Sequence, residues 1–95
     1  MDGVLWQLLA SSRGSDTRTA IVRLLDERPR NANQLAEELD VDYTTVRHHL
    51  DVLIENNVLR KSGDDYGAVY LFTDRLETNW DTVEEILETV GEGSP

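Results

Sequence analysis

Residues 33–61 of this chain read NQLAEELDVDYTTVRHHLDVLIENNVLRK, and this stretch decides the fold. Apolar residues recur in it at helical spacing, in two separate stripes. The stripes are Leu35, Ala36 and Leu39, and then Val46, Leu50 and Leu53. Spacings of three and four residues indicate helices with one buried face. Because only a short segment around Val41 separates the stripes, the sequence predicts a short helix, a tight turn and a longer helix, which is the helix-turn-helix motif.

The segments around the motif carry their own start and stop signals. Candidate N-caps are Asn33 and Asp42 for the two helices of the motif, and Thr78 or Asn79 for a last helix. The flanking segments are expected to form an amphipathic helix at about 3–11, a helix at about 16–28, two strands at 58–61 and 68–72, and a last helix ending near residue 91. The prediction is a mainly α fold with a small β-hairpin (α+β).

The length and composition limit the choice of architecture. Ninety-five residues suffice for a single domain over 1–95. Within it we expect an N-terminal helix in 1–12, a core in 16–73 and a C-terminal helix in 78–91. No run of eighteen apolar residues occurs, and the N-terminus lacks the pattern of a signal peptide. The absence of cysteine excludes disulfides and thiolate metal sites and is typical of a cytoplasmic protein.

The charge is unusual for a chain that carries this motif. Nineteen acidic residues face nine basic ones, which gives a net charge of −10, and eight of the nine basic residues are arginines. DNA-binding domains usually carry a basic surface. However, residues 12–62 have a net charge of only −1, whereas residues 63–95 have −8. The acidic, lysine-poor composition resembles that of proteins from extreme halophiles, in which molar salt reduces the screening length to about 3 Å.

The motif and its surroundings resemble the winged helix-turn-helix regulators of bacteria and archaea, most closely the ArsR-type group. The similar features are LAEEL at 35–39, the turn at 40–42, TVRHHLDVL at 45–53, NNVL at 56–59 and a candidate wing at 61–73. The family usually has glycine where Asn57 stands, and asparagine is the next best residue for a left-handed helix stop. The resemblance covers about 17–73 and implies a winged helix-turn-helix fold that binds double-stranded DNA.

The second helix of the motif, expected at 43–56, would then lie in the major groove. With Val46, Leu50 and Leu53 pointing inward, its outward residues near the N-terminal end are Tyr43, Thr44, Arg47 and His48. Arginine can form two hydrogen bonds to guanine or bind phosphate, and threonine and tyrosine can contact either. The alternative for Arg47 is an exposed ion pair with Asp51, four residues later.

Further DNA contacts are expected from the wing and from the loop after the second helix. Arg60 and Lys61 enter the wing and Tyr66 lies at its tip, although Asp64 and Asp65 beside Tyr66 would repel phosphate. The sequence leaves open whether the wing touches DNA. In the loop, Arg30 can contact the DNA backbone; the alternative is that it neutralises the carboxylates of Asp26 and Glu27.

The adjacent His48 and His49 do not predict a metal site. Neighbouring helical residues point about 100° apart, so their rings do not easily share one small ion. We expect His48 to face phosphates and His49 to pack beside Leu53 or cap the core. A His and carboxylate site between two subunits remains the alternative, and no cofactor or small-molecule ligand is evident.

The last helix carries a narrow apolar stripe on an otherwise acidic surface. Its spacing of three, four and three residues is that of a helix–helix seam. The N-terminal helix is also apolar and needs cover. We expect a homodimer in which the first and last helices of both chains pack together, as in ArsR-type regulators. The expected interface residues are Leu5, Trp6, Leu9, Trp80, Val83, Leu87 and Val90.

The sequence therefore favours a sequence-specific DNA-binding transcription regulator adapted to high salt. The alternative is a winged-helix protein–protein interaction module that has lost DNA binding, which the acidic charge would suit. An enzyme is not expected, because the chain lacks a glycine-rich phosphate loop, a cysteine nucleophile and a plausible Ser/His/Asp arrangement.

Overall fold

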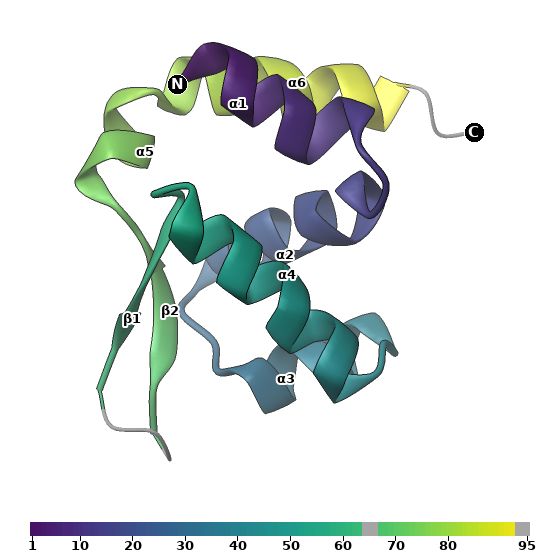
Figure 1. Ribbon diagram of the computed structural model, residues 1–95, viewed down its shortest axis with the longest axis vertical. Helices are drawn as coiled ribbons and strands as arrows, with labels where there is room; N and C mark the ends of the chain where they lie inside the picture. The colour runs from purple at the N-terminus through teal and green to yellow at the C-terminus, as the bar shows by residue number, and fades with distance from the viewer. Residues whose placement is uncertain (64–66, 93–95) are drawn as a thin grey trace.

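The computed structural model describes residues 1–63 and 67–92. The chain is mainly helical with one two-stranded sheet, which confirms the predicted fold class (Figure 1). In chain order the elements are α1 (Asp2–Trp6), a π-helical turn η1 (Gln7–Ser11), α2 (Ser15–Glu27), α3 (Ala32–Leu39), α4 (Tyr43–Glu55), β1 (Leu59–Ser62), β2 (Val69–Phe72), α5 (Asp74–Thr78) and α6 (Trp80–Glu92).

The helix-turn-helix consists of α3 and α4, and its ends are fixed by local hydrogen bonds. Asn31 caps α3 in a capping box with Gln34, so the cap lies two residues earlier than the one expected at Asn33 and the helix begins at Ala32. The Asp42 carboxylate accepts the Thr44 backbone N–H at 3.0 Å, which confirms Asp42 as the N-cap of α4. Asn57 follows α4 with φ of 62°, which confirms the left-handed stop expected there.

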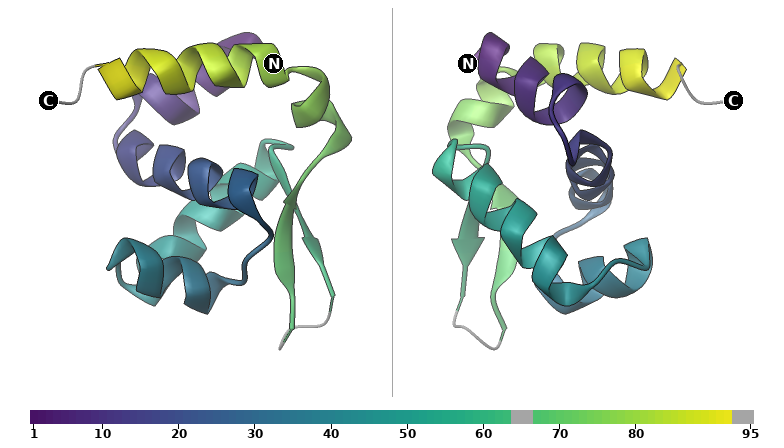
Figure 2. Two further views of the ribbon diagram at one scale, coloured as in Figure 1. Left: turned by 180° about the vertical axis from the view of Figure 1, so that it is seen from behind. Right: turned by 45° about the vertical axis from the view of Figure 1, so that its right-hand side comes forward.

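The sheet is an antiparallel hairpin whose strands extend away from the helices (Figures 1 and 2). Its register pairs Leu59 with Phe72 and Lys61 with Tyr70. The strands start one residue later than expected at each N-terminal end, because Val58 and Ala68 are buried but lie outside the ladder. An isolated bridge between Arg30 and Tyr70 ties β2 to the loop after α2.

The first and last helices form a layer on one side of the molecule. Figures 1 and 2 show α1 beside α6, with α2 beneath them, and the N-terminus at this layer. The Arg23 guanidinium on α2 donates to the Leu87 backbone carbonyl of α6 at 2.8 Å. The sequence did not predict α5, a five-residue helix capped by the Thr73 hydroxyl. Asn79 lies between α5 and α6, and its side chain donates to the Arg75 carbonyl at 2.8 Å.

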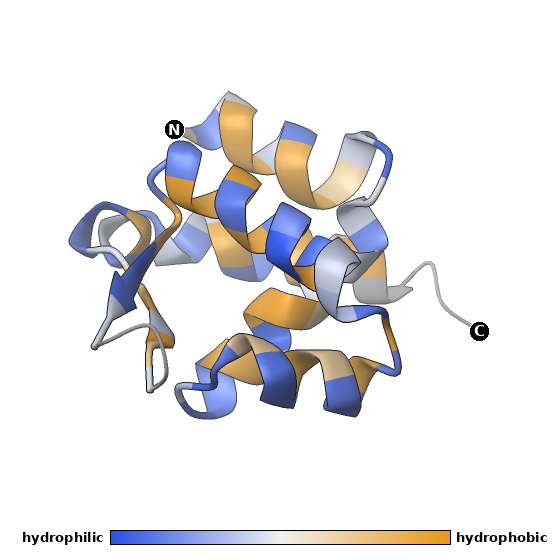
Figure 3. Cartoon of the chain, turned by 60° about the horizontal axis from the view of Figure 1, so that its bottom comes forward, coloured by the Kyte–Doolittle hydropathy of each residue, from blue (hydrophilic) through white to orange (hydrophobic). Residues whose placement is uncertain are grey.

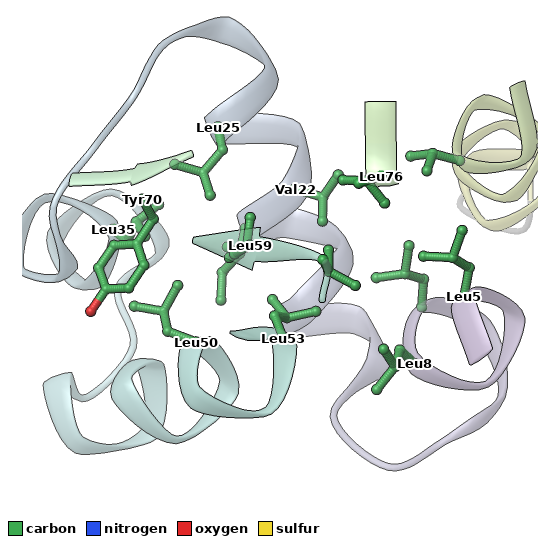
Figure 4. Packing of buried hydrophobic residues seen from close by; sticks show 14 of the residues in the cluster. Leu5, Leu8, Val22, Leu25, Leu35, Leu50, Leu53, Leu59, Tyr70 and Leu76 are labelled. Carbon is green, nitrogen blue, oxygen red and sulfur yellow. The ribbon is translucent and has the colours of Figure 1, made fainter. Parts of the chain in front are cut away.

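One hydrophobic core joins all these elements. Hydrophobic and hydrophilic residues alternate along each helix (Figure 3), as expected of amphipathic helices that bury one face. Leu50 and Leu53 of α4 meet Leu59 and Tyr70 of the hairpin, and Leu5 of α1 closes the far end (Figure 4). Within the part of the chain that is described, no helix has the length and apolarity needed to cross a membrane.

Candidate nucleic-acid interface

The N-terminal part of α4 presents its side chains to solvent. Val46, His49 and Leu50 are buried and hold the helix on the core. Tyr43, Thr44 and His48 are exposed, and Tyr43 is 43% accessible, which is unusual for a large aromatic side chain. The helical period that buries one face therefore leaves the expected contact residues on the other.

Arg47 lies between these exposed residues and is half-buried. Its Nη1 donates to the Tyr43 hydroxyl at 3.1 Å, and its guanidinium carbon lies 5.9 Å from the centre of the Tyr43 ring. The hydrogen bond to Tyr43 raises the pKa of Arg47, and nearby Tyr70 and Asp51 raise it further. Arg47 and Asp51 form no ion pair among the described residues, so Tyr43 takes the place of the carboxylate partner considered as the alternative.

The Tyr43 contacts hold the Arg47 guanidinium in one orientation at the start of α4. Its Nε is buried without a hydrogen-bond partner in the described part of the chain. A planar group with fixed direction and several N–H donors suits bidentate contacts to guanine or phosphate. Contact of Arg47 with DNA stays a prediction.

A small polar cleft lies beside Arg47, between three elements. Its volume is about 40 Å³, and it lies where the start of α3, the start of α4 and the hairpin meet. The lining residues are Asn31, Ala32, Asn33, Tyr43, Arg47, Lys61, Ala68 and Tyr70. The sequence did not indicate Tyr70 or Ala68 here, because both lie more than twenty residues along the chain from Tyr43 and Arg47. β2 reads Val-Tyr-Leu-Phe and is apolar at every position, so the sequence carries no alternation that could have indicated an inward Tyr70.

The two basic residues of β1 lie on opposite faces of the hairpin, as successive strand residues do. Lys61 faces the polar cleft and therefore lies on the same side as Arg47. Arg60 is exposed and lines a different and larger cleft with Asp26 and Trp80. The expected wing residues Asp64, Asp65 and Tyr66 lie outside the described residues.

Arg30 does not join this surface. Its side chain is only 3% accessible, and its guanidinium binds the Glu38 carboxylate and the Leu24 carbonyl. The Glu38 hydrogen bond raises the pKa of Arg30, although burial opposes that shift. Arg30 thus neutralises carboxylates within the fold, as the alternative had it, but its main partner is Glu38, and of the two carboxylates expected only Glu27 forms an ion pair with it among the described residues.

The adjacent histidines diverge as the helical geometry requires. His48 is exposed, whereas His49 is 8% accessible and accepts a hydrogen bond from Arg18 at 3.1 Å on its Nδ1. Burial lowers the pKa of His49, and the charge of Arg18 and then His48 lower it further. Among residues 1–63 and 67–92, no group of three or more His, Asp or Glu side chains is placed to hold a metal ion.

The expected dimer residues divide into two groups. Leu5, Leu9 and Val83 are at most 1% accessible within a single chain, because α1 and α6 pack on the same core. These three side chains stabilise the monomer and cannot reach a partner in this arrangement, which corrects the expectation from the narrow apolar spacing. The other four remain partly accessible at the edge of the core: Trp6, Trp80, Leu87 and Val90.

Part of the chain matches a known protein family. Residues 15–61 match the family described as bacterial regulatory protein, arsR family. These residues form an ArsR-family helix-turn-helix. They run from the first residue of α2 to Lys61 of β1 and so include the whole exposed end of α4. No curated protein sequence matches the chain.

Solved structures with the same fold are transcription regulators of low sequence identity. The adhesin competence repressor of Streptococcus pyogenes is 18% identical with a TM-score of 0.67, over 97% of this chain and 70% of that chain. BldR from Sulfolobus solfataricus is 17% identical with a TM-score of 0.70, over 97% and 67% of the two chains. Tm0710 from Thermotoga maritima is 21% identical with a TM-score of 0.66, over 98% and 69%. The chain therefore shares the fold of these regulators, and its residues 15–61 match a family of regulatory proteins.

Proposed function

We propose that this ArsR-like protein is a sequence-specific DNA-binding transcription regulator that inserts the N-terminal end of α4 into the major groove. The observation that carries the proposal is the group at that end, in which Tyr43, Thr44 and His48 are exposed and Arg47 is half-buried beside them. Arginine hydrogen-bonds guanine, threonine bonds base edges or phosphate, and an exposed tyrosine offers both a ring and a hydroxyl. Lys61 lies on the same side and supplies a positive charge for the backbone.

Loss of Arg47 tests this assignment directly. The Arg47→Ala protein should bind its operator more weakly by about 1–3 kcal/mol if the arginine forms a bidentate contact to guanine. Arg75→Ala is the matched control, since Arg75 is an exposed arginine on α5, next to the opposite end of α4. Equal affinities of the Arg47→Ala protein and the wild type would reject the role of Arg47.

Footprinting of genomic DNA in molar KCl tests the function as a whole. Molar salt suppresses non-specific phosphate binding, so protection should be confined to sites read by base contacts. Protection of discrete sites supports a regulator. Failure to protect any site, with the protein folded, would instead favour the interaction module considered from the acidic composition.

We propose further that the protein acts as a homodimer through α1 and α6. Support comes from Val4, 40% accessible on α1, and from the partly accessible Trp6, Leu87 and Val90 in the same layer. Dimerisation would place two copies of α4 on successive turns of DNA, which is how helix-turn-helix dimers read paired half-sites. Sedimentation velocity in high salt should give the mass of a dimer, and a monomer at micromolar concentration would reject this part of the proposal.

A further inference from the structure

A second cleft lies on the side of the hairpin that carries Arg60, away from Lys61 and the polar cleft. It has a volume of about 420 Å³, within the range of small-molecule sites. It lies between the end of α2, the strands and the α5–α6 junction, elements that surround one side of the hairpin in Figure 1. The residues around it are Leu25, Asp26, Arg60, Tyr70, Leu71, Phe72, Glu77 and Trp80.

The floor of the cleft is aromatic and is held in place. Phe72 and Trp80 lie with ring centres 5.2 Å apart and planes inclined by 51°. The Trp80 indole Nε1 donates to the Glu84 carboxylate at 3.2 Å, which orients the ring from the other side. An indole face that is fixed and half-accessible is the best aromatic surface for a cation.

The charges of the cleft favour a ligand of positive charge. Asp26 and Glu77 are exposed carboxylates, and neither forms an ion pair in the described part of the chain. Arg60 carries the opposite charge, so the net charge of the three residues is −1. The net charge of −10 on the whole protein adds attraction for cations and repulsion for anions.

We propose that this cleft binds small organic cations with an aromatic or apolar body, such as quaternary ammonium compounds. The apolar body would lie against Phe72 and Trp80, and the charged group would lie between Asp26 and Glu77. The inference rests on the cleft alone and does not depend on DNA binding.

Two small probes of opposite charge test the proposal. Benzyltrimethylammonium and phenylmethanesulfonate both carry a benzyl group, and their compact charged groups have opposite sign. Each is titrated into the full chain at the lowest KCl concentration that preserves helicity, and the indole N–H resonances of the two tryptophans are followed by NMR. Trp6→Phe assigns the Trp80 signal. The ammonium probe should shift the Trp80 resonance saturably and leave that of Trp6 in place, and the sulfonate should shift neither.

Charge-removing variants locate the site. Asp26→Asn and Glu77→Gln should each weaken the ammonium probe by about 5-fold, which corresponds to one exposed charge pair at contact distance. Arg60→Gln should strengthen it by a similar factor, because a repulsive charge is removed. Glu85→Gln, an exposed residue of α6 outside the cleft, should change nothing. Equal shifts by both probes, no shift of Trp80, or equal weakening by Asp26→Asn and Glu85→Gln would each overturn the proposal.

Discussion

Arg18 carries a positive charge into the interior and is bound there by neutral groups only. It is 5% accessible and donates to the carbonyls of Leu8 at 2.8 Å and Arg13 at 3.1 Å, and to the Ser12 hydroxyl. Its remaining contact is with His49 of α4. Burial lowers the pKa of Arg18, and no carboxylate partner offsets this among residues 1–63 and 67–92. One side chain thus joins α2, the η1 turn and α4.

The Arg18 contact defines the protonation state of His49 and makes stability depend on pH. Because Arg18 can only donate, the Nδ1 of His49 must accept and the imidazole is neutral. Burial, Arg18 and His48 hold the pKa of His49 below its usual value of 6.5. The unfolded chain therefore binds this proton at a higher pH than the folded one. Stability should be complete above pH 6.5 and fall as the pH drops toward the folded pKa, by at most about 1.4 kcal/mol per pH unit.

Denaturant unfolding of the wild type and two variants between pH 7.5 and 5.0 checks this dependence. His49→Gln should lose the slope in that window, whereas His48→Gln, which changes an exposed ring, should keep it. The same slope in wild type and His49→Gln would show that other groups titrate.

Gly14 is required by the close approach of the same cluster. Its φ is +85°, and a Cβ built on it would lie 2.5 Å from His49 Cε1 and 3.1 Å from Arg18 Nη1. Gly14→Ala should therefore destabilise the protein by about 1–3 kcal/mol, through both backbone strain and overpacking. Gly3→Ala is the control, because its Cβ meets nothing within 4 Å and the residue lies in α1. Thermal unfolding should show a lower midpoint for Gly14→Ala alone, and equal midpoints for the two variants would contradict the close approach.

The sequence could predict which residues of α4 point outward but could not predict what they meet. The helical period alone separates Tyr43 and Thr44 from Val46 and Leu50. In contrast, the buried roles of Arg18 and Arg30 depend on carbonyls and carboxylates brought from other elements. Arginine is usually exposed, so sequence patterns give no warning when the fold encloses it.

At the scale of elements, the ends of the two motif helices follow the same geometry. Asp40 after α3 and Asn57 after α4 both adopt left-handed backbone, with φ of 54° and 62°. In each case the next residue donates back to the helix: Val41 to the Ala36 carbonyl at 3.1 Å, and Val58 to the Leu53 carbonyl at 2.9 Å. The resemblance of 56–59 to the family predicted the second stop, whereas an aspartate gave no comparable signal for the first.

Asp40 is consequently a site where the protein can be stabilised. Asparagine is better suited to a left-handed stop, and it removes a negative charge from the C-terminal end of α3. Asp40→Asn should raise the free energy of unfolding by about 0.3–1 kcal/mol. The same change at Asp42 should not help, because that residue caps the N-terminal end of α4, where negative charge is favourable.

Chemical denaturation of both aspartate variants checks the prediction. The expected result is a higher midpoint for Asp40→Asn and an unchanged or lower one for Asp42→Asn. A lower midpoint for Asp40→Asn would mean that its carboxylate is stabilising in the turn.

The elements that the sequence failed to predict are those that depend on long-range packing. The short α5 contains only five residues and is held by the Thr73 cap and by the burial of Leu76. Isolated helices of this length are unstable, so periodicity cannot reveal them. The apolar spacing of α6 predicts a helix–helix contact. It cannot show that part of this contact is made within a single chain, where Val83 is buried.

At the scale of the whole molecule, charge is distributed unevenly around a core that is ordinary in composition. The buried cluster consists of leucine, isoleucine and valine with few exceptions. The exposed side of α6 carries four acidic residues, namely Asp81, Glu84, Glu85 and Glu88. Cations are concentrated in residues 12–62, which include the helix-turn-helix. The acidic surplus therefore lies mainly in the C-terminal third of the chain, outside the helix-turn-helix.

The net charge of −10 should make folding depend on salt. Mutual repulsion of the carboxylates destabilises the compact state, and salt reduces it by shortening the screening length from about 30 Å at 0.01 M to about 3 Å at 1 M. Circular dichroism should therefore show helicity falling as KCl is dialysed from molar to about 10 mM concentrations. A variant with Glu84, Glu85 and Glu88 changed to glutamine should retain its helicity to lower salt, because the charge removed lies on a single exposed face. Full helicity of the wild type at the lowest salt would contradict halophilic adaptation and leave the fold unaffected.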